Sequence, residues 1–217
     1  MNINKATTAS FDVDAQNGFT PVCPDELPVE DGCAIVPALN VQSKYASLRV
    51  GSKDAHPANA IWAASDENPS FSAVEGDNVD IRWNMHCVPG TKGFELIDGL
   101  PRVTDYDFMV FKGVEPTMHP YGACYHDLKD KMSTGIIEFL KAKGIETVLC
   151  GGLATEYCLK LTALQLADAG FKVIVNLSAC RAINNDDVEQ AILEMKAKGV
   201  LVVSDCSELS LNDKGEE

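Results

Sequence analysis

A cysteine at the start of a predicted helix is the residue in this chain with the clearest chemical potential. The segment 150–158 (CGGLATEYC) runs from an apolar strand through two glycines into a helix whose first turn carries Cys158. The free N–H groups and the partial positive charge at a helix start favour thiolate over thiol. We therefore predict that Cys158 is a nucleophile. The alternative is a buried structural residue, which is what free cysteine usually is.

Polar side chains follow three other apolar segments of the chain. Asp14 follows the first, Asp54 and His56 follow the second, and Lys112 ends the third. In an open α/β fold the carboxyl ends of the strands lie along one edge of the sheet, where ligands bind. We therefore expect these side chains to meet Cys158 at that edge.

Asp54 and His56 also suggest a metal site, because side chains two residues apart on an extended loop can point the same way. Together with His86 they offer one carboxylate and two imidazoles, which suit Zn(II) or Fe(II) with water completing the coordination. A D-x-H pair alone is a weak motif, and a hydrogen-bonded surface pair is the alternative.

Lys112 and Asp14 have ordinary explanations as well. A lysine that ends a buried strand is partly desolvated and needs an anionic partner such as a thiolate or carboxylate. It can also extend its ammonium to water, which is the commoner case. Asp14 can equally cap a turn.

Apolar strands alternate with amphipathic helices along the chain, as the periodicity and the helix end signals indicate. The predicted strands are 9–13, 45–50, 108–111, 147–150, 172–176 and 201–204, and the predicted helices lie within 31–43, 127–143, 155–170 and 184–199. Asp127 is the predicted N-cap of the second helix. This alternation predicts an α/β fold in three layers, α/β/α, with a mostly parallel six-stranded sheet in the order 3-2-1-4-5-6.

The segment 58–100 has no clear periodicity, contains many turn formers and carries Trp62 and Trp83. Long ordered loops in compact proteins are usually functional, so we expect this one to contribute to the metal and substrate sites. No linker-like composition interrupts the chain, which predicts a single domain over 1–217.

Composition excludes some classes of function. The net charge of -14 and the pI near 4.6 disfavour binding to nucleic acid or anionic membranes. No apolar run approaches the roughly 20 residues of a membrane helix, and the first residues lack the apolar segment of a signal peptide, so we expect a cytoplasmic protein. The eight cysteines include no CxxC pair, which favours reduced thiols.

Four ordered segments carry a family resemblance, and they are 14–19 (DAQNGF), 54–59 (DAHPAN), 83–91 (WNMHCVPGT) and 152–158 (GLATEYC). They resemble the patterns D-x-Q-N-D-F, D-W-H-P-A-N-H, W-P-x-H-C-V-x-G-T and G-x-A-T-D-x-C of the isochorismatase-like cysteine hydrolases, and within them of the nicotinamidase/pyrazinamidase group. Lys112 falls where that family has its catalytic lysine. The resemblance covers nearly the whole chain, and the ordered set is highly specific.

The resemblance implies a metal-containing amidohydrolase that converts nicotinamide, and also pyrazinamide, to the acid and ammonia. Asp14 would accept the proton of Cys158, Lys112 would stabilise charge, and the thiolate would form a thioester with the substrate. Such an enzyme serves NAD salvage and pyridine nucleotide biosynthesis.

The resemblance also assigns the binding residues. Backbone N–H groups of Ala154 and Cys158 would form the oxyanion hole, beside a peptide bond between residues 153 and 154 that is typically cis. One divalent metal, with zinc first and iron or manganese as alternatives, would be held by Asp54, His56 and His86 and would bind the pyridine nitrogen. The residues expected at the substrate, with core packing as the alternative for the aromatic ones, are Phe19, Trp83, Tyr121 and Leu153.

Three positions depart from the family patterns. Ala60 stands where many relatives have another histidine of the metal site, so three protein ligands are expected, with waters in the remaining positions. Ala55 replaces an aromatic residue and Gly18 replaces an aspartate, and both changes could alter packing of the pocket.

Two other functions remain open at this point. One is a metal-independent amidase of the same superfamily that acts on another small amide. The other is a non-enzymatic binding or redox-sensing protein in which Cys158 is an oxidisable thiol. An isochorismate hydrolase is disfavoured because those enzymes lack this cysteine, and a homo-oligomer is compatible with the sequence.

Overall fold

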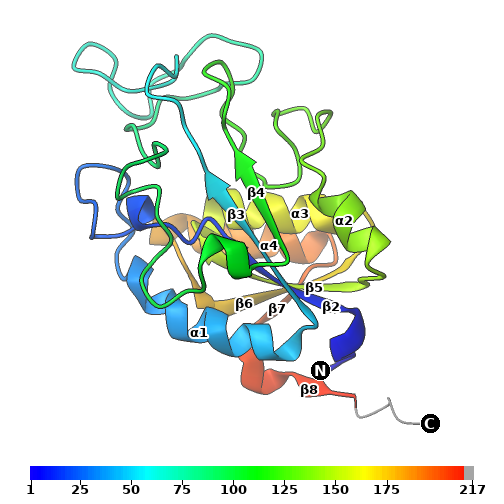
Figure 1. The fold of residues 1–217 in the computed structure, drawn as a ribbon. Coiled ribbons are helices and arrows are strands. Elements are labelled where there is room, and N and C mark those ends of the chain that lie inside the picture. The colour runs from blue at the N-terminus through cyan, green and yellow to red at the C-terminus, as the bar shows by residue number, and fades with distance from the viewer. Residues whose placement is uncertain (213–217) are drawn as a thin grey trace.

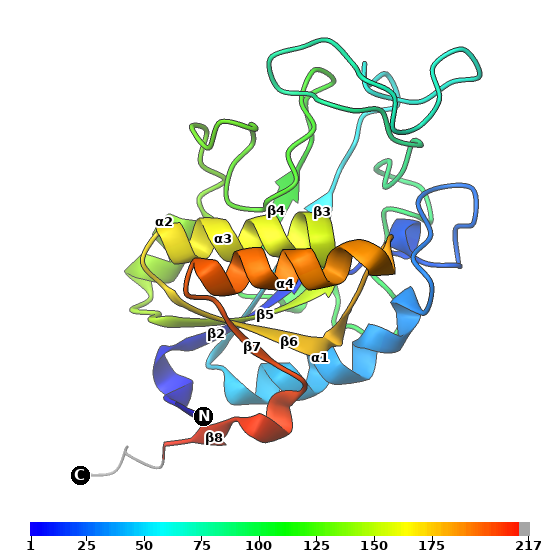
Figure 2. The same ribbon diagram turned by 180° about the vertical axis from the view of Figure 1, so that it is seen from behind.

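Six parallel strands form the central sheet, and helices cover both of its faces (Figures 1 and 2). The computed structural model describes residues 1–212. The strands of the sheet are β2 (Thr8–Val13), β3 (Leu48–Asp54), β4 (Phe108–Lys112), β5 (Thr147–Leu153), β6 (Lys172–Arg181) and β7 (Leu201–Val203). Their order is β4-β3-β2-β5-β6-β7, which is 3-2-1-4-5-6 when counted from β2. The predicted fold class and strand order are therefore confirmed.

Four helices complete the three layers. Helix α1 (Val36–Gln42) lies on one face of the sheet, and α2 (Ile136–Ala142), α3 (Lys160–Asp168) and α4 (Val188–Ala197) lie on the other (Figures 1 and 2). Short strands β1 (Asn2–Ile3) and β8 (Ser210–Leu211) pair in parallel outside the main sheet. None of these helices is long and apolar enough to cross a membrane, within residues 1–212.

Both faces of the sheet are buried, as expected for apolar parallel strands. Every residue of β2 and β5 is buried. The largest apolar cluster joins these strands to α2, α3 and α4, and Cys150 lies inside it. A second cluster packs α1 against the chain that leaves β2 and β5. The strand ends that carry the candidate site are therefore held by packed side chains on both faces of the sheet.

Three strands continue at least three residues beyond their predicted ends, and one of them is β5, which ends at Leu153 instead of residue 150. Strand β3 extends to Asp54 because it is hydrogen-bonded between β2 and β4, and Asp54 pairs with Lys112. Strand β6 continues to Arg181 after a register shift in its pairing with β5. Hydrogen bonding to neighbouring strands thus keeps polar segments extended although their sequence is typical of loops. Asp54, which was expected on a loop, therefore lies on a strand.

The N-cap of α2 is Gly135 instead of the predicted Asp127, so the helix begins eight residues later than predicted, at Ile136. Asp127 caps a loop: its carboxylate accepts hydrogen bonds from the backbone N–H groups of Lys129 (2.9 Å), Lys131 (3.0 Å) and Met132 (2.6 Å). Aspartate is common at such positions because its side chain satisfies nearby backbone donors. Asp127 is therefore a capping residue, as the sequence indicated, but it caps a turn and not a helix.

Segment 55–102, between β3 and β4, is built from turns and isolated bridges. Most of it lies beyond the carboxyl ends of the strands, and its last part returns beside α1, where Asn40 Nδ2 donates to Gly99 O (Figure 1). Trp62 and Trp83 are buried and form a small apolar cluster of their own with Ala60 and Val79. This cluster gives the segment an ordered position above the sheet edge.

We expect Asp127→Ala to lower the free energy of unfolding by about 1–3 kcal/mol, because three backbone donors lose their shared acceptor. Chemical denaturation measures the change. The exposed Asp66 provides a matched control, and Asp66→Ala should change stability by no more than about 0.5 kcal/mol. Equal stability of the two variants would contradict the capping role.

Candidate active site

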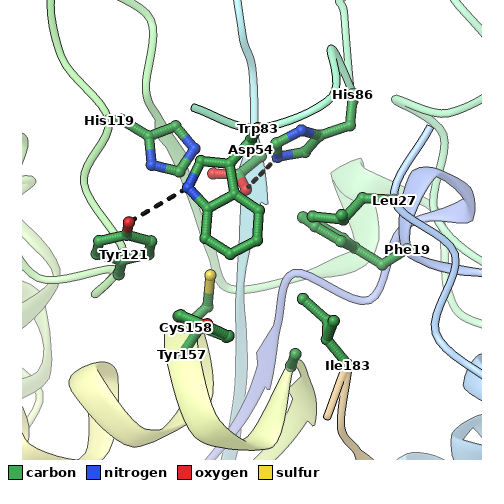
Figure 3. Close-up of a pocket in the computed structure, with 11 residues that line it drawn as sticks. Phe19, Leu27, Asp54, Trp83, His86, His119, Tyr121, Tyr157, Cys158 and Ile183 are labelled. Atoms are coloured by element: carbon green, nitrogen blue, oxygen red, sulfur yellow. Dashed lines mark hydrogen bonds and ion pairs between the residues drawn. The ribbon is translucent and has the colours of Figure 1, made fainter. Parts of the chain in front are cut away.

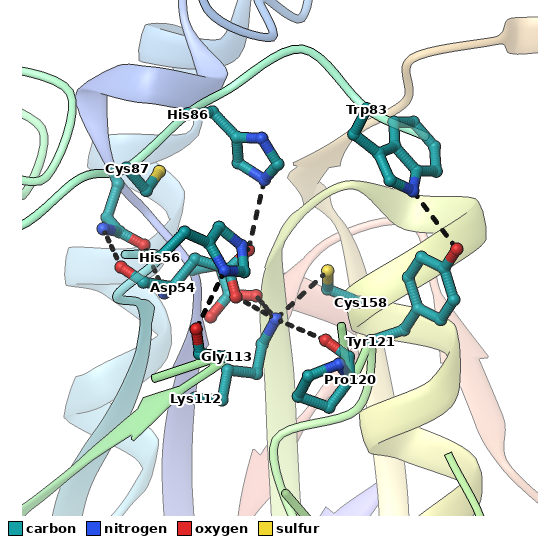
Figure 4. Close-up of polar contacts among 12 residues, drawn as sticks. Asp54, His56, Trp83, His86, Cys87, Lys112, Gly113, Pro120, Tyr121 and Cys158 are labelled. Atoms are coloured by element: carbon teal, nitrogen blue, oxygen red, sulfur yellow. Dashed lines mark hydrogen bonds and ion pairs between the residues drawn. The ribbon is translucent and has the colours of Figure 1, made fainter. Parts of the chain in front are cut away.

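Four strand ends bring the predicted catalytic side chains together at the carboxyl edge of the sheet (Figure 4). Asp14 directly follows β2, Asp54 ends β3, Lys112 ends β4, and Cys158 lies five residues beyond β5. These four side chains therefore lie at one edge of the sheet, as the sequence predicted.

Lys112 lies at the centre of this group. Its Nζ is 3.0 Å from Asp14 Oδ2 and 3.6 Å from Cys158 Sγ, and it forms a short ion pair with Asp54 Oδ1. The side chain is completely buried, so the lysine does not extend to water. Burial lowers the pKa of Lys112, but the neighbouring carboxylates of Asp14 and Asp54 outweigh burial and raise it well above its ordinary value. Lys112 is therefore a fixed positive charge.

Asp14 is suited to accept a proton. It adopts a left-handed backbone conformation (φ 45°), and its Oδ1 accepts a 2.6 Å hydrogen bond from Ser52 Oγ. Burial raises the pKa of Asp14 to about 6, although the Lys112 charge opposes that rise. A carboxylate with this pKa is ionised at neutral pH and is a stronger base than an exposed aspartate.

Cys158 lies in a single turn of π-helix, Thr155–Leu159, that precedes α3. Single π turns often occur at functional sites. Burial raises the pKa of the thiol well above its ordinary value, and the nearby Lys112 does not compensate. The expectation that the helix start alone favours thiolate is therefore wrong for this protein, because desolvation is the larger effect. The thiol needs a base, and one carboxylate oxygen of Asp14 lies within 4.8 Å of its sulfur.

The peptide bond between Leu153 and Ala154 is cis, as the resemblance implied. The carbonyl oxygen of Ala154 accepts hydrogen bonds from the N–H groups of Tyr157 and Leu159, both at 3.2 Å. Ala154 is thereby held against the turn that carries Cys158. This arrangement brings the two residues proposed for the oxyanion hole to the same pocket.

A small pocket opens above the Cys158 sulfur (Figure 3). About 280 Å³ of space lies between its walls, open solvent included, so the pocket is small. It is lined by Phe19, Leu27, Asp54, Trp83, His86, His119, Tyr121, Ala154, Tyr157, Cys158 and Ile183. The aromatic walls and the thiol at the base suit a single small ring that bears an electrophilic carbon.

Three of the four predicted substrate residues line this pocket, namely Phe19, Trp83 and Tyr121. Trp83 Nε1 donates to Tyr121 Oη (3.2 Å), which in turn donates to Asp80 Oδ1 (2.7 Å). Leu153 does not line the pocket. Its side chain is completely buried in the apolar cluster around α1, because the strand residue before the cis bond points into the core.

The sequence did not identify four other residues of the pocket. Tyr157 and Ile183 had a detectable signal, since one adjoins Cys158 and the other follows β6 at the same sheet edge. Leu27 and His119 come from irregular segments without a hydrophobic period. Only the fold brings those two segments over the site.

The other two predicted metal ligands, His56 and His86, lie near Asp54 Oδ2, the carboxylate oxygen that does not pair with Lys112 (Figure 4). The Nε2 atoms of His56 and His86 are 3.4 Å and 3.7 Å from Asp54 Oδ2. The opposite ring nitrogens face backbone carbonyls, with His56 Nδ1 3.2 Å from Gly113 O and His86 Nδ1 2.7 Å from Asn84 O. Donation by Nδ1–H to a carbonyl leaves Nε2 with a free lone pair, which is the usual arrangement of metal-binding histidines.

The donor set fits a divalent metal. His56 Nε2 is buried and has no hydrogen-bond partner among the described residues, and burial lowers the pKa of this imidazole so that it is neutral. Burial alone would raise the pKa of Asp54, but Lys112 and His56 hold it well below its ordinary value, so the carboxylate is charged. Two imidazoles and one carboxylate suit zinc, iron or manganese.

A second group of potential ligands, Asp14, Asp54 and Cys158, does not form a metal site. The ammonium of Lys112 already lies among these three side chains. A metal ion there would be repelled by the lysine charge. The thiol cluster and the candidate metal cluster are therefore separate and share Asp54.

Residues 8–206 match the isochorismatase domain model, so the chain belongs to the isochorismatase domain family. It is 34% identical over 196 residues to a nicotinamidase of Acinetobacter baylyi, and this match covers 88% of the chain and 90% of that protein.

Solved structures agree with the family assignment. A nicotinamidase/pyrazinamidase of Acinetobacter baumanii has a TM-score of 0.83 at 33% identity and covers 91% of this chain and 96% of that one. A pyrazinamidase of Pyrococcus horikoshii in complex with zinc has a TM-score of 0.72 at 29% identity. The match covers 91% of this chain and 98% of that one.

We expect Gly113→Ala to reduce retained Zn²⁺ at least about tenfold, because an added Cβ would lie 2.3 Å from His56 Cε1 and displace the imidazole. Metal analysis after zinc loading and desalting measures the loss. Gly144→Ala is the matched control, since Gly144 has nearly the same positive φ (69° against 66°) but no atom within 4 Å of the added Cβ. Both variants bear the left-handed strain of about 1–2 kcal/mol. Full zinc retention by Gly113→Ala would contradict the role of His56.

Proposed function

We propose that this protein is a nicotinamidase that hydrolyses the carboxamide of nicotinamide, and also of pyrazinamide, to a carboxylate and ammonia. The main support is the buried Lys112 ammonium that contacts Asp14, Asp54 and Cys158 beneath a small aromatic pocket. The nicotinamidase names of the similar proteins from two Acinetobacter species support the substrate. A role in NAD salvage would follow from this activity.

The chemistry begins with the Cys158 thiol. Asp14 takes the thiol proton, and Sγ attacks the carboxamide carbon to form a tetrahedral oxyanion. Lys112 keeps its own proton and offsets the negative charge on the sulfur and the carboxylates. Backbone N–H groups of Ala154 and Cys158 stabilise the oxyanion.

Collapse of the oxyanion breaks the C–N bond, and Asp14 returns its proton to the leaving nitrogen, so that ammonia departs and a thioester remains. A water molecule then adds to the thioester carbon while Asp14 takes one of its protons. The C–S bond breaks, the acid leaves, and the sulfur regains a proton from Asp14. Each proton that Asp14 accepts is thus returned within the cycle.

Asp54, His56 and His86 would hold one divalent metal ion, with zinc as the first candidate and iron or manganese as alternatives. The zinc complex of the Pyrococcus relative supports this choice. When bound, the metal supplies a coordination position for the pyridine nitrogen. Phe19, Trp83 and Tyr121 would then pack around the ring and direct its carboxamide to Cys158.

We expect Cys158→Ala to reduce nicotinamide hydrolysis by about 10³-fold or more, because the variant cannot form the thioester. Ammonia release by the metal-loaded protein measures activity, and mass spectrometry of the quenched wild type detects the nicotinoyl adduct. Cys33→Ser is the control, because Cys33 is an exposed free thiol, and it should retain full activity.

Undiminished turnover by Cys158→Ala would overturn the assignment of the nucleophile. If the wild type hydrolyses another small amide but not nicotinamide, the mechanism stands and the substrate assignment is wrong. Activity that survives both His56→Ala and metal removal would favour a metal-independent amidase.

We expect kcat/KM to rise with pH up to about pH 6 and then level off, because Asp14 must be ionised to accept the thiol proton and its pKa is about 6. Ser52→Ala removes the hydrogen bond that favours the carboxylate form. The pKa of Asp14 should then rise, and the acidic limb of the profile should move to higher pH. If the acidic limb of the profile lies at the same pH in Ser52→Ala as in the wild type, a group other than Asp14 controls that limb.

A further inference from the structure

We propose that His119 is a fourth protein ligand of the metal site, and this inference rests on the metal site of the proposed function. The sequence predicted three protein ligands because Ala60 offers no donor. His119 comes from a different segment, after β4, and one nitrogen of its imidazole lies within 4.8 Å of a nitrogen of His56 and of His86. Figure 3 shows His119 and His86 at the same end of the pocket. The site would then hold one carboxylate and three imidazoles.

The position of the ring is the first support. The imidazole of His119 stacks on His56 with 5.1 Å between ring centroids and 19° between planes, and its centroid is 6.0 Å from that of His86. One nitrogen from each ring lies within 4.8 Å of the other two. Ligand atoms across one zinc ion, each roughly 2.0–2.1 Å from it, are at most about 4 Å apart. The spacing of the three nitrogens thus exceeds the width of a coordination sphere by less than about 1 Å at most.

The unsatisfied polar atoms of His119 are the second support. The residue is 4% exposed, and neither Nδ1 nor Nε2 has a hydrogen-bond partner within residues 1–212. A buried histidine in an ordinary core has at least one partner, because an unpaired buried nitrogen costs roughly 1–3 kcal/mol. A metal ion would satisfy one nitrogen of the ring and explain why a polar side chain occupies this position.

The surroundings of His119 fix its orientation without using its nitrogens. Trp62 contacts the ring edge-on at 4.4 Å, Tyr121 lies at 5.1 Å in a T-shaped arrangement, and Trp83 stacks at 6.0 Å. The backbone N–H of His119 donates to Asn78 O at 2.8 Å, which ties the residue to segment 55–102. Aromatic packing therefore pre-orients the imidazole toward the cluster, as the rigid shell around a metal site requires.

His119 also lines the substrate pocket, so a hydrogen bond to substrate is the competing role. The two roles differ in the absence of substrate. A metal ligand contributes to metal affinity in the free protein, whereas a residue that only binds substrate changes KM and leaves metal affinity intact. Metal affinity without nicotinamide is therefore the deciding quantity.

The experiment measures Zn²⁺ affinity of the metal-free protein by competition with a chromophoric chelator, without substrate. We expect His119→Ala to weaken Zn²⁺ binding by about 10- to 100-fold or more, and His56→Ala to do the same. His126→Ala is the control, because His126 is the one histidine of the four that lies outside the cluster, and it should bind zinc like the wild type. Wild-type affinity in His119→Ala would overturn the proposal.

A second variant covers the case in which His119→Ala does not fold. His119→Cys, made in a Cys158→Ala background, places a thiolate donor at the same position. After Co²⁺ loading, a sulfur-to-cobalt charge-transfer band should appear that the Cys158→Ala parent lacks. Tight Co²⁺ binding without this band would show that residue 119 is outside the coordination sphere and would overturn the proposal.

The outcomes also separate this inference from the proposed function. If the wild type binds zinc through His119 but hydrolyses no amide, the ligand assignment stands and the nicotinamidase proposal fails. If the wild type hydrolyses nicotinamide but binds no metal, the ligand assignment fails and the thiol mechanism stands.

Discussion

A buried ammonium is stable only when anionic groups replace its lost hydration, and Lys112 meets this requirement with Asp14 and Asp54. The three charges occupy a region from which water is excluded, so each depends on the others. This dependence sets the state of Cys158 as well. With the lysine charge already balanced by carboxylates, too little positive potential remains to ionise the buried thiol. In the proposed mechanism, the thiol proton therefore moves to Asp14 as the substrate is attacked.

Asp54 connects the two halves of the site. Its Oδ1 faces Lys112 while its Oδ2 faces His56 and His86, so one carboxylate serves both the thiol cluster and the candidate metal cluster. A metal ion at the histidines would draw charge from this carboxylate and alter the field at Lys112. In the proposed mechanism, substrate positioning and nucleophile activation would thus be coupled through a single side chain that the parallel pairing of β3 and β4 holds in place.

Much of the fold and the thiol cluster could be predicted from the sequence because local patterns encode them. Apolar runs broken by polar residues marked the strands, and parallel topology then placed Asp14, Lys112 and Cys158 at one edge. The spacing of Asp54 and His56, taken with His86, indicated a metal site, and the resemblance to the isochorismatase-like hydrolases supported these roles. The strand ends were less predictable, because hydrogen bonding by neighbouring strands extended β3 and β6 through polar residues.

The sequence by itself determined which reactive residues follow which strands, since that information lies in short apolar and polar runs. Only the tertiary structure decided that burial raises the pKa of Cys158 and that Leu153 lies in the core. It also decided that Asp127 caps a loop and that His119 lies beside His56. These features depend on burial and on contacts between segments far apart in the chain, and segments 55–102 and 113–135 have no helix or strand period that would predict them. Desolvation, which outweighs the helix-start effect at the thiol, is a property of the packed site as a whole.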